Sequence, residues 1–191
     1  MDTELSNKIV SGLEKLSEVF RYLYWEKAKR FGLSPVQIQI LLFMQQHREE
    51  FCKVSELARE FNLTKPTISD AVKVLIAKDF VSKEKSGLDK RSYILRLTEN
   101  GVKLNSGLED FSKPLVVSLA EFSPLDLKSF YGNITNLIYH LNRSGVIQVQ
   151  RMCFNCKYYS DKDGGHYCNL MQLPLQTEDI RLDCPEFENA E

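Results

Sequence analysis

The residues with the most distinctive chemistry are four cysteines near the end of the chain. Cys153, Cys156, Cys168 and Cys184 form a C-x2-C-x11-C-x15-C pattern. Four thiolates are enough to hold one tetrahedral zinc ion. A tail of about forty residues is below the size at which an apolar core alone usually stabilises a fold. We therefore expect a structural zinc that is bound by these cysteines and supplies folding free energy to the tail.

Two other uses of the same cysteines stay open. Four cysteines also hold a 4Fe–4S cluster, and the Cys184-Pro185 step recurs at cluster ligands. The tail resembles the cluster-binding region of high-potential iron-sulfur proteins in its C-x2-C followed by aromatic residues and in Leu170 and Phe187, which follow the third and fourth cysteines. A thiol oxidoreductase or electron carrier is the remaining alternative. It would need a strand before C-x2-C and a helix after it, and neither pattern is present.

The composition is that of a globular protein. The chain has 191 residues, of which 43% are hydrophobic and 27% charged. No stretch approaches the roughly 20 apolar residues that span a bilayer, and acids stand near the start where a signal peptide carries basic residues. Cysteines without a secretory signal are typical of a compartment that keeps thiols reduced. We expect a cytoplasmic protein that does not contact a membrane.

Charge is unevenly distributed along the chain, although the net charge is only −1. Residues 151–191 hold four Lys or Arg against eight Asp or Glu, so the tail is a separate acidic unit. Residues 53–98 hold ten Lys or Arg against six acids, and five of the ten lie between Lys83 and Arg96. A local positive charge of this kind suits contact with phosphates, and it is also common on a plain solvated face.

Apolar residues near the start recur at spacings of three and four. Between Leu5 and Arg30 they line one face of a helix that is too long for one small core to cover. Gly32 is placed to end this helix. Ser34, Pro35 and Gln37 then predict the capped start of a second helix that runs to about residue 47.

Two further helices are predicted after residue 97. Thr98 is placed to cap a long helix through Glu121 that is kinked at Pro114. Ser123-Pro124 opens another helix that ends near Asn142. Apolar residues of this last helix form a second face that lacks a partner within a small domain; they are Leu127, Ile134, Leu137, Ile138 and Leu141.

The most informative stretch is VSELAREFNLTKPTISDAVKVLIAKDFV, residues 54–81. A short helix ends at a turn through Asn62-Leu63, and Thr64 caps a second helix. The buried stripe of the second helix is Ile68, Val72 and Leu75, so polar residues project from its other side: Lys65, Thr67, Ser69, Asp70 and Lys73. This layout predicts a helix-turn-helix whose second helix enters the major groove, with an ordinary helical hairpin as the alternative.

A basic hairpin follows this helix pair directly. Val81 to Lys85 predicts one strand, Ser86-Gly87 a turn, and the alternating Tyr93, Leu95 and Leu97 a second strand. A helix-turn-helix followed by such a hairpin has the order of a winged helix.

The sequence DKRSYILRLTENG resembles the wing of the MarR family of bacterial transcription regulators; the residues that carry the resemblance are Asp89, Arg91, Leu97, Thr98 and Gly101. The resemblance covers roughly residues 5–143. It implies a mainly α fold with a winged helix-turn-helix and long dimerisation helices over residues 1–145. Residues 146–191 would then add a small, irregular metal-binding module. In this family the first and last helices of two subunits interlock, so the resemblance implies a homodimer.

The resemblance also implies a function, namely transcription regulation through sequence-specific binding of double-stranded DNA at a pseudo-palindromic operator. The helix after Thr64 would lie in the major groove, with Lys65, Thr67, Ser69 and Lys73 as its contacts. Arg91 would reach the minor groove from the wing beside Lys90, with Asp89 holding its guanidinium. Family members often bind small aromatic or anionic effectors, and no residue here identifies one.

Two acids depart from the family pattern. Asp70 stands where relatives often have a basic or neutral residue, and Asp79 stands where a Gly often ends the recognition helix. Asp70 would repel a phosphate but could accept a hydrogen bond from a cytosine amino group. No catalytic triad, phosphate loop or paired-carboxylate site is present in the sequence, so we expect no enzyme. The alternative function is a regulator in which an iron-sulfur tail senses redox state or iron and gates DNA binding.

Overall fold

The structure, a computed structural model, describes residues 3–85, 93–108, 110–149, 151–162 and 164–190. The chain divides into two compact units. The N-terminal unit holds residues 1–58 and 63–116, and the C-terminal unit holds residues 59–62 and 117–191. None of the helices in the described part of the chain has the length and apolar character needed to cross a membrane.

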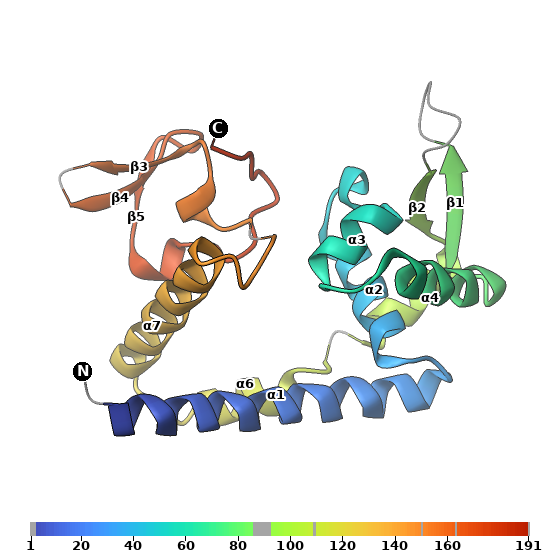
Figure 1. Cartoon of the computed structure of the whole chain (residues 1–191), viewed down its shortest axis with the longest axis horizontal. Helices are drawn as coiled ribbons and strands as arrows, with labels where there is room; N and C mark the ends of the chain where they lie inside the picture. Colours follow the sequence, from blue (N-terminus) through green and yellow to red (C-terminus); the bar gives the residue numbers. More distant parts are fainter. Residues whose placement is uncertain (1–2, 86–92, 109, 150, 163, 191) are drawn as a thin grey trace. The chain divides into compact units, whose positions relative to one another are not determined.

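The N-terminal unit is a group of helices with one two-stranded hairpin (Figure 1). Its elements in chain order are α1 (Thr3–Phe31), α2 (Pro35–Gln46), the 3-10 turn η1 (Glu49–Phe51), α3 (Val54–Glu60), α4 (Lys65–Ala77), β1 (Val81–Lys85), β2 (Tyr93–Leu97), α5 (Glu99–Ser106) and the first part of α6 (Lys113–Leu119). The strands pair antiparallel, with Val81 opposite Leu97 and Lys85 opposite Tyr93. The predicted order of helices and hairpin is confirmed.

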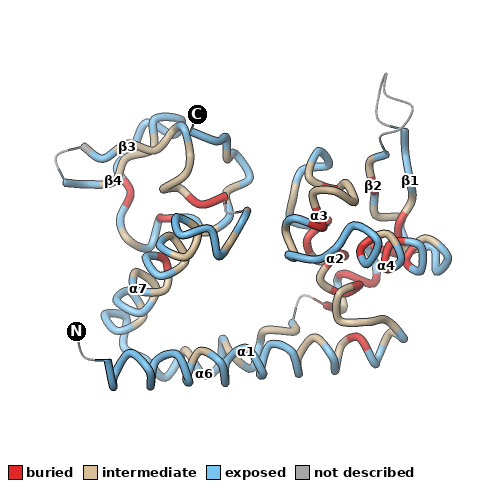
Figure 2. Tube along the Cα trace, in the orientation of Figure 1, coloured by how far each residue is buried: buried red, intermediate tan, exposed pale blue. Residues whose placement is uncertain are grey.

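The core of this unit is built around α2, which packs against α1, α4, α5 and β2. Figure 2 shows the buried residues concentrated in α2, α3 and α4. Burying one large aliphatic side chain contributes about 1.5–3 kcal/mol. The side chains of this core that are fully shielded from solvent include Ile38, Leu41, Leu57, Ile68 and Leu75.

Side-chain caps fix where the helices begin, as predicted. The Gln37 N–H donates to Ser34 Oγ (3.4 Å) and the Ser34 N–H donates to Gln37 Oε1 (2.8 Å), which completes a capping box at α2. The Thr67 N–H donates to Thr64 Oγ1 (3.2 Å) at α4. Gly32, with a φ of 61°, ends α1 in the left-handed conformation. The residues at which α2 and α4 begin are therefore fixed by the local sequence.

The helix predicted over residues 98–121 is wrong in one respect, because the chain is helical there in two separate segments. α5 ends before Gly107, and α6 begins only after a turn. Pro114 lacks an N–H, and its ring would clash with the carbonyl four residues earlier, so one helix cannot continue through this position without strain. Lys27 Nζ donates to the Gly107 carbonyl (3.3 Å) near the break. The proline thus starts a new helix instead of kinking an existing one.

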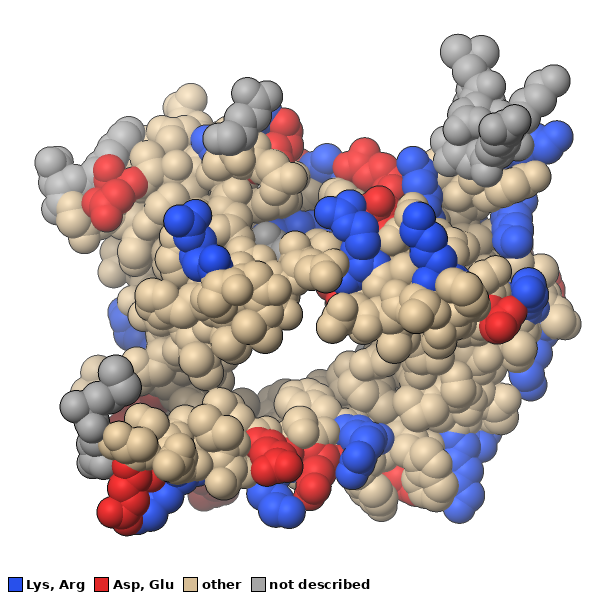
Figure 3. Space-filling view, in the orientation of Figure 1, with Lys and Arg blue, Asp and Glu red and all other residues tan. Residues whose placement is uncertain are grey.

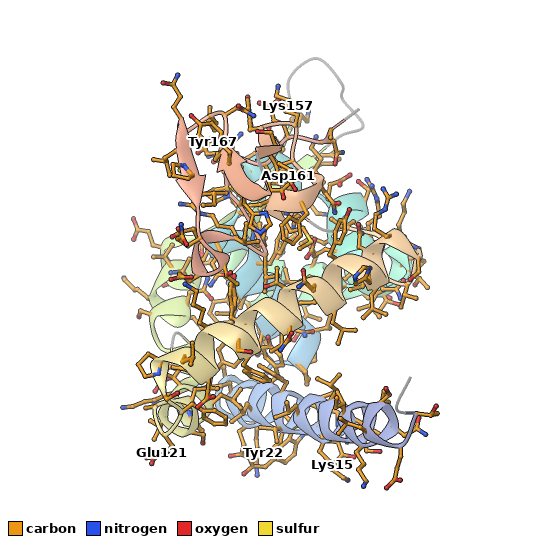
Figure 4. All side chains as sticks on the ribbon, turned by 90° about the vertical axis from the view of Figure 1, so that its left-hand side faces the viewer. Lys15, Tyr22, Glu121, Lys157, Asp161 and Tyr167 are labelled. Carbon is orange, nitrogen blue, oxygen red and sulfur yellow. The ribbon has the colours of Figure 1, made fainter. Side chains whose placement is uncertain are left out.

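α1 is mostly exposed along its length. Only Ala28 of its 29 residues is buried, and Figure 4 shows Lys15 and Tyr22 projecting from the helix into solvent. The apolar side chains that the sequence places on one face are half-buried or exposed; the most exposed are Leu5, Ile9, Leu16 and Phe20. The prediction that one small core cannot cover this helix is confirmed.

The C-terminal unit contains α7 (Pro124–Arg143) and the tail. The elements of the tail are η2 (Cys153–Asn155), β3 (Tyr159–Lys162), β4 (Gly165–Cys168), β5 (Leu173–Leu175) and η3 (Thr177–Asp179). The three strands form one antiparallel sheet in the order β3-β4-β5. The tail is thus more regular than the irregular module that the sequence predicts.

This small sheet escapes sequence analysis because its strands have only three or four residues, too few for a clear alternation. The one sequence feature that indicates this sheet is the glycine-containing turn between β3 and β4. Gly164 adopts a φ of 77°, and its N–H donates to Asp161 Oδ1 (3.1 Å). Figure 4 shows Asp161 and Tyr167 on the strands that flank this turn.

The tail packs on one side of α7. The Tyr131 hydroxyl donates to the Ile180 carbonyl (2.5 Å), and the ring of Tyr139 meets that of Phe154 edge to face with 5.3 Å between centroids. η3 also lies against α7. These contacts group α7 with the tail, whereas the sequence suggests a division near residue 145.

A glycine substitution tests the packing of α5 against the loop before β1. A Cβ at Gly101 would lie 2.1 Å from the Phe80 carbonyl oxygen. We expect Gly101→Ala to cost about 1–3 kcal/mol, because backbone must move to relieve the overlap. The measurement is thermal unfolding followed by circular dichroism.

Gly12→Ala is the matched control, because Gly12 also lies in a helix and a Cβ there would meet no atom within 4 Å. Alanine has the better helix propensity by about 1 kcal/mol, so the control should be neutral or stabilising. Equal unfolding temperatures for the two variants would refute the predicted close approach.

Candidate nucleic-acid interface and cysteine cavity

α3 and α4 form a helix pair joined by a tight turn. Leu57 and Ala58 are the buried residues of α3. Asn62 turns the chain with a φ of 50°, a conformation that Asn tolerates better than most residues. The predicted apolar stripe of α4, Ile68, Val72 and Leu75, is buried together with Ala71. The helix-turn-helix predicted from the sequence is therefore present.

The opposite side of α4 carries the predicted contact residues. Lys65, Thr67 and Lys73 are exposed, and Ser69 is half-buried. Lys73 Nζ donates to Asp70 Oδ1 (2.8 Å), so the acid that departs from the family pattern partly neutralises a lysine on the same face. Both side chains are about two-thirds exposed, and an exposed pair of this kind contributes less than about 1 kcal/mol. A phosphate could compete for Lys73.

The strands β1 and β2 form the base of the wing, defined here as residues 81–97. Arg96 forms one ion pair with Glu84 (2.6 Å) on the neighbouring strand and a second with Glu49. Lys83 and Lys85 are exposed. Figure 3 shows Lys and Arg side chains spread along the edge of this unit that carries β1, at the right of the view. Three residues predicted at the wing tip, Asp89, Lys90 and Arg91, lie outside the described residues.

Asp79 occupies a backbone position that favours glycine. It follows α4 with a φ of 59°, which is the left-handed region used at helix ends. Two side chains hold it there: the Thr98 hydroxyl donates to the Asp79 carbonyl (2.6 Å), and Asn100 Nδ2 donates to Asp79 Oδ2 (2.8 Å). A hydrogen-bonded aspartate thus occupies this left-handed helix end, where the resemblance leads us to expect a glycine.

The four cysteines predicted as metal ligands line one cavity in the tail. Cys153 and Cys156 lie at η2, Cys168 ends β4, and Cys184 follows η3. We call this space the cysteine cavity. It holds about 470 Å³ that no protein atom fills, including solvent at its mouth. Its other lining residues are five apolar or aromatic ones, Tyr158, Tyr159, Leu170, Met171 and Leu175, and three charged ones, Asp179, Arg181 and Glu186.

Backbone pairing brings the two ends of the tail together at this cavity. The Cys153 N–H donates to the Arg181 carbonyl (3.1 Å), and the Cys184 N–H donates to the Arg151 carbonyl (3.0 Å). The Arg181 N–H in turn donates to Cys153 Sγ (3.2 Å). Burial raises the pKa of the Cys153 thiol, the bond from Arg181 lowers it, and the three neighbouring thiols raise it. The cysteine pattern does not reveal Arg181, because hydrogen-bond donors to sulfur have no sequence signature.

The thiols do not converge on one point. Among the residues that the structure describes, no three His, Cys, Asp or Glu side chains lie close enough together to hold a metal ion. A Zn–S bond is about 2.3 Å long, so sulfurs that share a zinc lie within about 4 Å of one another. The cysteines surround a space instead, and the structural zinc stays a prediction.

Cys52 is a separate, buried thiol in the N-terminal unit. It is 2% exposed, and its Sγ donates to the Arg48 carbonyl at 3.6 Å. Burial and the nearby Glu49 carboxylate raise the pKa of the Cys52 thiol to about 11. At neutral pH it is therefore protonated and poorly nucleophilic, which argues against a redox-sensing role for this cysteine.

Comparison with known proteins bears on the helix-turn-helix. Residues 31–92 match the model of the MarR family, which is less than half of the chain. A search of curated proteins gave no match.

Several solved structures share the fold. They include the MepR–DNA complex of S. aureus (TM-score 0.59, 19% identity, covering 68% of this chain and 94% of that one), MarR of S. aureus in complex with salicylate and kanamycin (0.63, 22%, 74% and 95%) and a MarR transcriptional regulator from Methanosarcina mazei Go1 (0.57, 20%, 75% and 98%). At these identities the similarity establishes the fold alone. The chain therefore has the winged-helix fold of these regulators, and the segment that holds its helix-turn-helix matches the MarR family.

Proposed function

We propose that this protein is a transcription regulator of the MarR type that acts in the cytoplasm without an enzymatic step. The observation that carries the proposal is α4, whose apolar side is buried while its polar side is open, inside the segment that matches the MarR family. A recognition helix needs one buried face and one open face, because the first packs against the core and the second must reach base edges. The solved structure of S. aureus MepR, which shares this fold, is a complex with DNA. We extend DNA binding to this chain because the two share a fold.

The proposed contacts divide by groove. α4 would enter the major groove, with Lys65 and Lys73 near phosphates and Thr67 and Ser69 near bases. The wing would lie along the adjacent minor groove and insert Arg91 there, with Lys90 beside it and Asp89 restricting the guanidinium. These assignments rest on the sequence pattern and on the orientation of α4.

We also propose a homodimer on a pseudo-palindromic operator. α1 exposes apolar side chains such as Leu5, Ile9 and Phe20 over several turns. A soluble monomer rarely leaves so large an apolar surface uncovered. A second copy of the chain is the fitting occupant, because two symmetric half-sites require two recognition helices in fixed relation.

Two further parts of the proposal concern ligands. The S. aureus MarR structure that shares this fold contains salicylate, so a small aromatic anion is the effector class to test here. The tail is proposed to be held by a metal centre on Cys153, Cys156, Cys168 and Cys184, because few apolar side chains of the tail are buried; Met152, Leu175 and Ile180 are those that the structure describes.

The wing contact can be tested with Arg91→Ala. We expect affinity for a selected operator to fall about tenfold or more, and the slope of log K against log salt to fall by about one, because one cation leaves the interface. Lys103→Ala removes an exposed lysine of α5 and is the matched control. Binding that ignores both salt and Arg91→Ala would contradict the proposed function. Fluorescence anisotropy with labelled duplex measures both quantities.

The recognition helix can be tested with Asp70→Asn, which keeps the shape of the side chain but removes its charge. Lys73 then loses its ion-pair partner, so we expect tighter binding of non-specific duplex and a steeper salt slope, by up to about one. Glu121→Gln is the control, an exposed acid outside the helix-turn-helix. If Asp70 reads a cytosine amino group, operator preference falls at the same time. Unchanged non-specific affinity would show that Lys73 does not contact phosphate.

The proposed dimer can be tested with Leu137→Asp. Leu137 lies on the apolar side of α7 and is 40% exposed. A carboxylate buried there without a partner costs several kcal/mol, so we expect dimer dissociation to rise by about a hundredfold or more. Asn136→Asp adds the same charge at the exposed neighbouring position, which points elsewhere because successive helical residues are rotated by about 100°. Sedimentation velocity reports the result; two variants with the same dissociation constant would exclude this face of α7 from the dimer.

A further inference from the structure

The spacing of the thiols around the cysteine cavity does not suit a single metal ion. All four cysteines of the tail line it, yet no three metal-binding side chains among the described residues are close enough to share one ion. A single zinc would require its sulfurs to lie within about 4 Å of one another. The cysteines therefore line a space instead of meeting at one point.

We propose that the cavity holds a 4Fe–4S cluster ligated by Cys153, Cys156, Cys168 and Cys184. Such a cluster carries four irons and four sulfides between its four thiolates, so the thiolates lie around a volume and not around a point. One cysteine for each iron uses all four side chains and leaves no ligand missing.

The lining of the cavity suits this occupant. Leu170, Met171 and Leu175 supply apolar surface, and the rings of Tyr158 and Tyr159 close part of the wall. Two carboxylates, Asp179 and Glu186, also line the cavity. The apolar part of the wall limits the access of water, which is one of the factors that set the potential of a cluster. The inorganic sulfides of a cluster can occupy such an apolar space without a protein hydrogen bond to each.

Arg181 supplies the polar contacts that thiolate sulfur accepts. Its backbone N–H donates to Cys153 Sγ at 3.2 Å, and its guanidinium Nη1 lies 3.9 Å from Cys184 Sγ. Four thiolates on a cluster of charge 2+ leave a net charge of 2−, so the guanidinium beside Cys184 offsets part of it. Each thiol loses its proton to solvent when its sulfur binds iron.

The segment that carries Arg181 also contacts α7. Ile180, the residue before it, accepts the hydroxyl hydrogen bond of Tyr131, and Glu178 pairs with Lys128 (2.8 Å). Filling the cavity would therefore fix the tail against the helix whose other side carries the proposed dimer contacts. This step rests on the proposed function, and it makes operator affinity depend on whether the cluster is present.

The test uses the full chain, purified without oxygen and reconstituted with ferric iron, sulfide and dithiothreitol. One dithiothreitol, on oxidation to its disulfide, supplies the two electrons that convert four ferric ions to the 2+ state of the cluster. We expect about four irons and four sulfides per chain and a brown, broadly absorbing protein. One zinc per chain without sulfide, or no bound metal at all, would overturn the proposal, and so would two irons per chain.

Single Cys→Ser variants locate the ligands. Substitution of any of Cys153, Cys156, Cys168 or Cys184 should remove at least half of the bound iron. Cys52→Ser is the matched control, because Cys52 is a cysteine outside the cavity, and it should keep the full iron content. Equal iron loss in the control and the tail variants would overturn the assignment. Because the iron and sulfide content of the wild-type chain is decisive by itself, the result does not depend on how well each variant folds.

Operator affinity of the loaded and cluster-free chains then tests the coupling to α7. We expect a difference of about tenfold or more between them, with Lys103→Ala behaving like the parent chain in both states. A cluster with unchanged DNA affinity would overturn the coupling and leave the site intact. A cluster in a chain that binds no DNA in either state would overturn the proposed function and leave the site intact.

Discussion

The proposed DNA-binding side of this molecule depends on the burial of one stripe of α4. Ile68, Val72 and Leu75 are almost completely shielded from solvent within the core around α2. Because side chains project from a helix at fixed angles, holding this stripe also fixes the directions of Lys65 and Lys73. The exposed face carries no packing function, so its residues can be selected for a partner. The Asp70–Lys73 pair on it contributes little to stability and is well placed to be exchanged for a phosphate.

The tail cannot be held by apolar burial in the way that α4 is, because it has little apolar interior. Its sheet is small, and its described buried apolar side chains are few, chiefly Met152, Leu175 and Ile180. Chains of about forty residues usually need a disulfide or a metal to fold. The five cysteines are all free thiols, and metal ligation is the cross-link that we propose for the four in the tail.

Features fixed by neighbouring residues could be read from the sequence, and features fixed by distant ones could not. The caps at Ser34 and Thr64 and the apolar stripe of α4 depend on spacings of three or four residues, so they were predictable. The end of α5 near Gly107 depends partly on Lys27, some 80 residues away. The cysteines were recognisable by spacing, but their arrangement around a cavity depends on pairing between the two ends of the tail. The same pairing brings in Arg181, which has no sequence signature.

α7 links the tail to the proposed dimer contacts, because two of its sides carry different residues. Tyr131 and Tyr139 contact the tail on one side. Leu137 and its apolar neighbours lie on another side, where they are half-buried or exposed. A helix backbone is stiff over a few turns, so a change in how the tail holds one side alters the position of the other. If the cavity fills and empties, the effect would reach the proposed dimer contacts through this one helix, and a contiguous chain of moving side chains is not required.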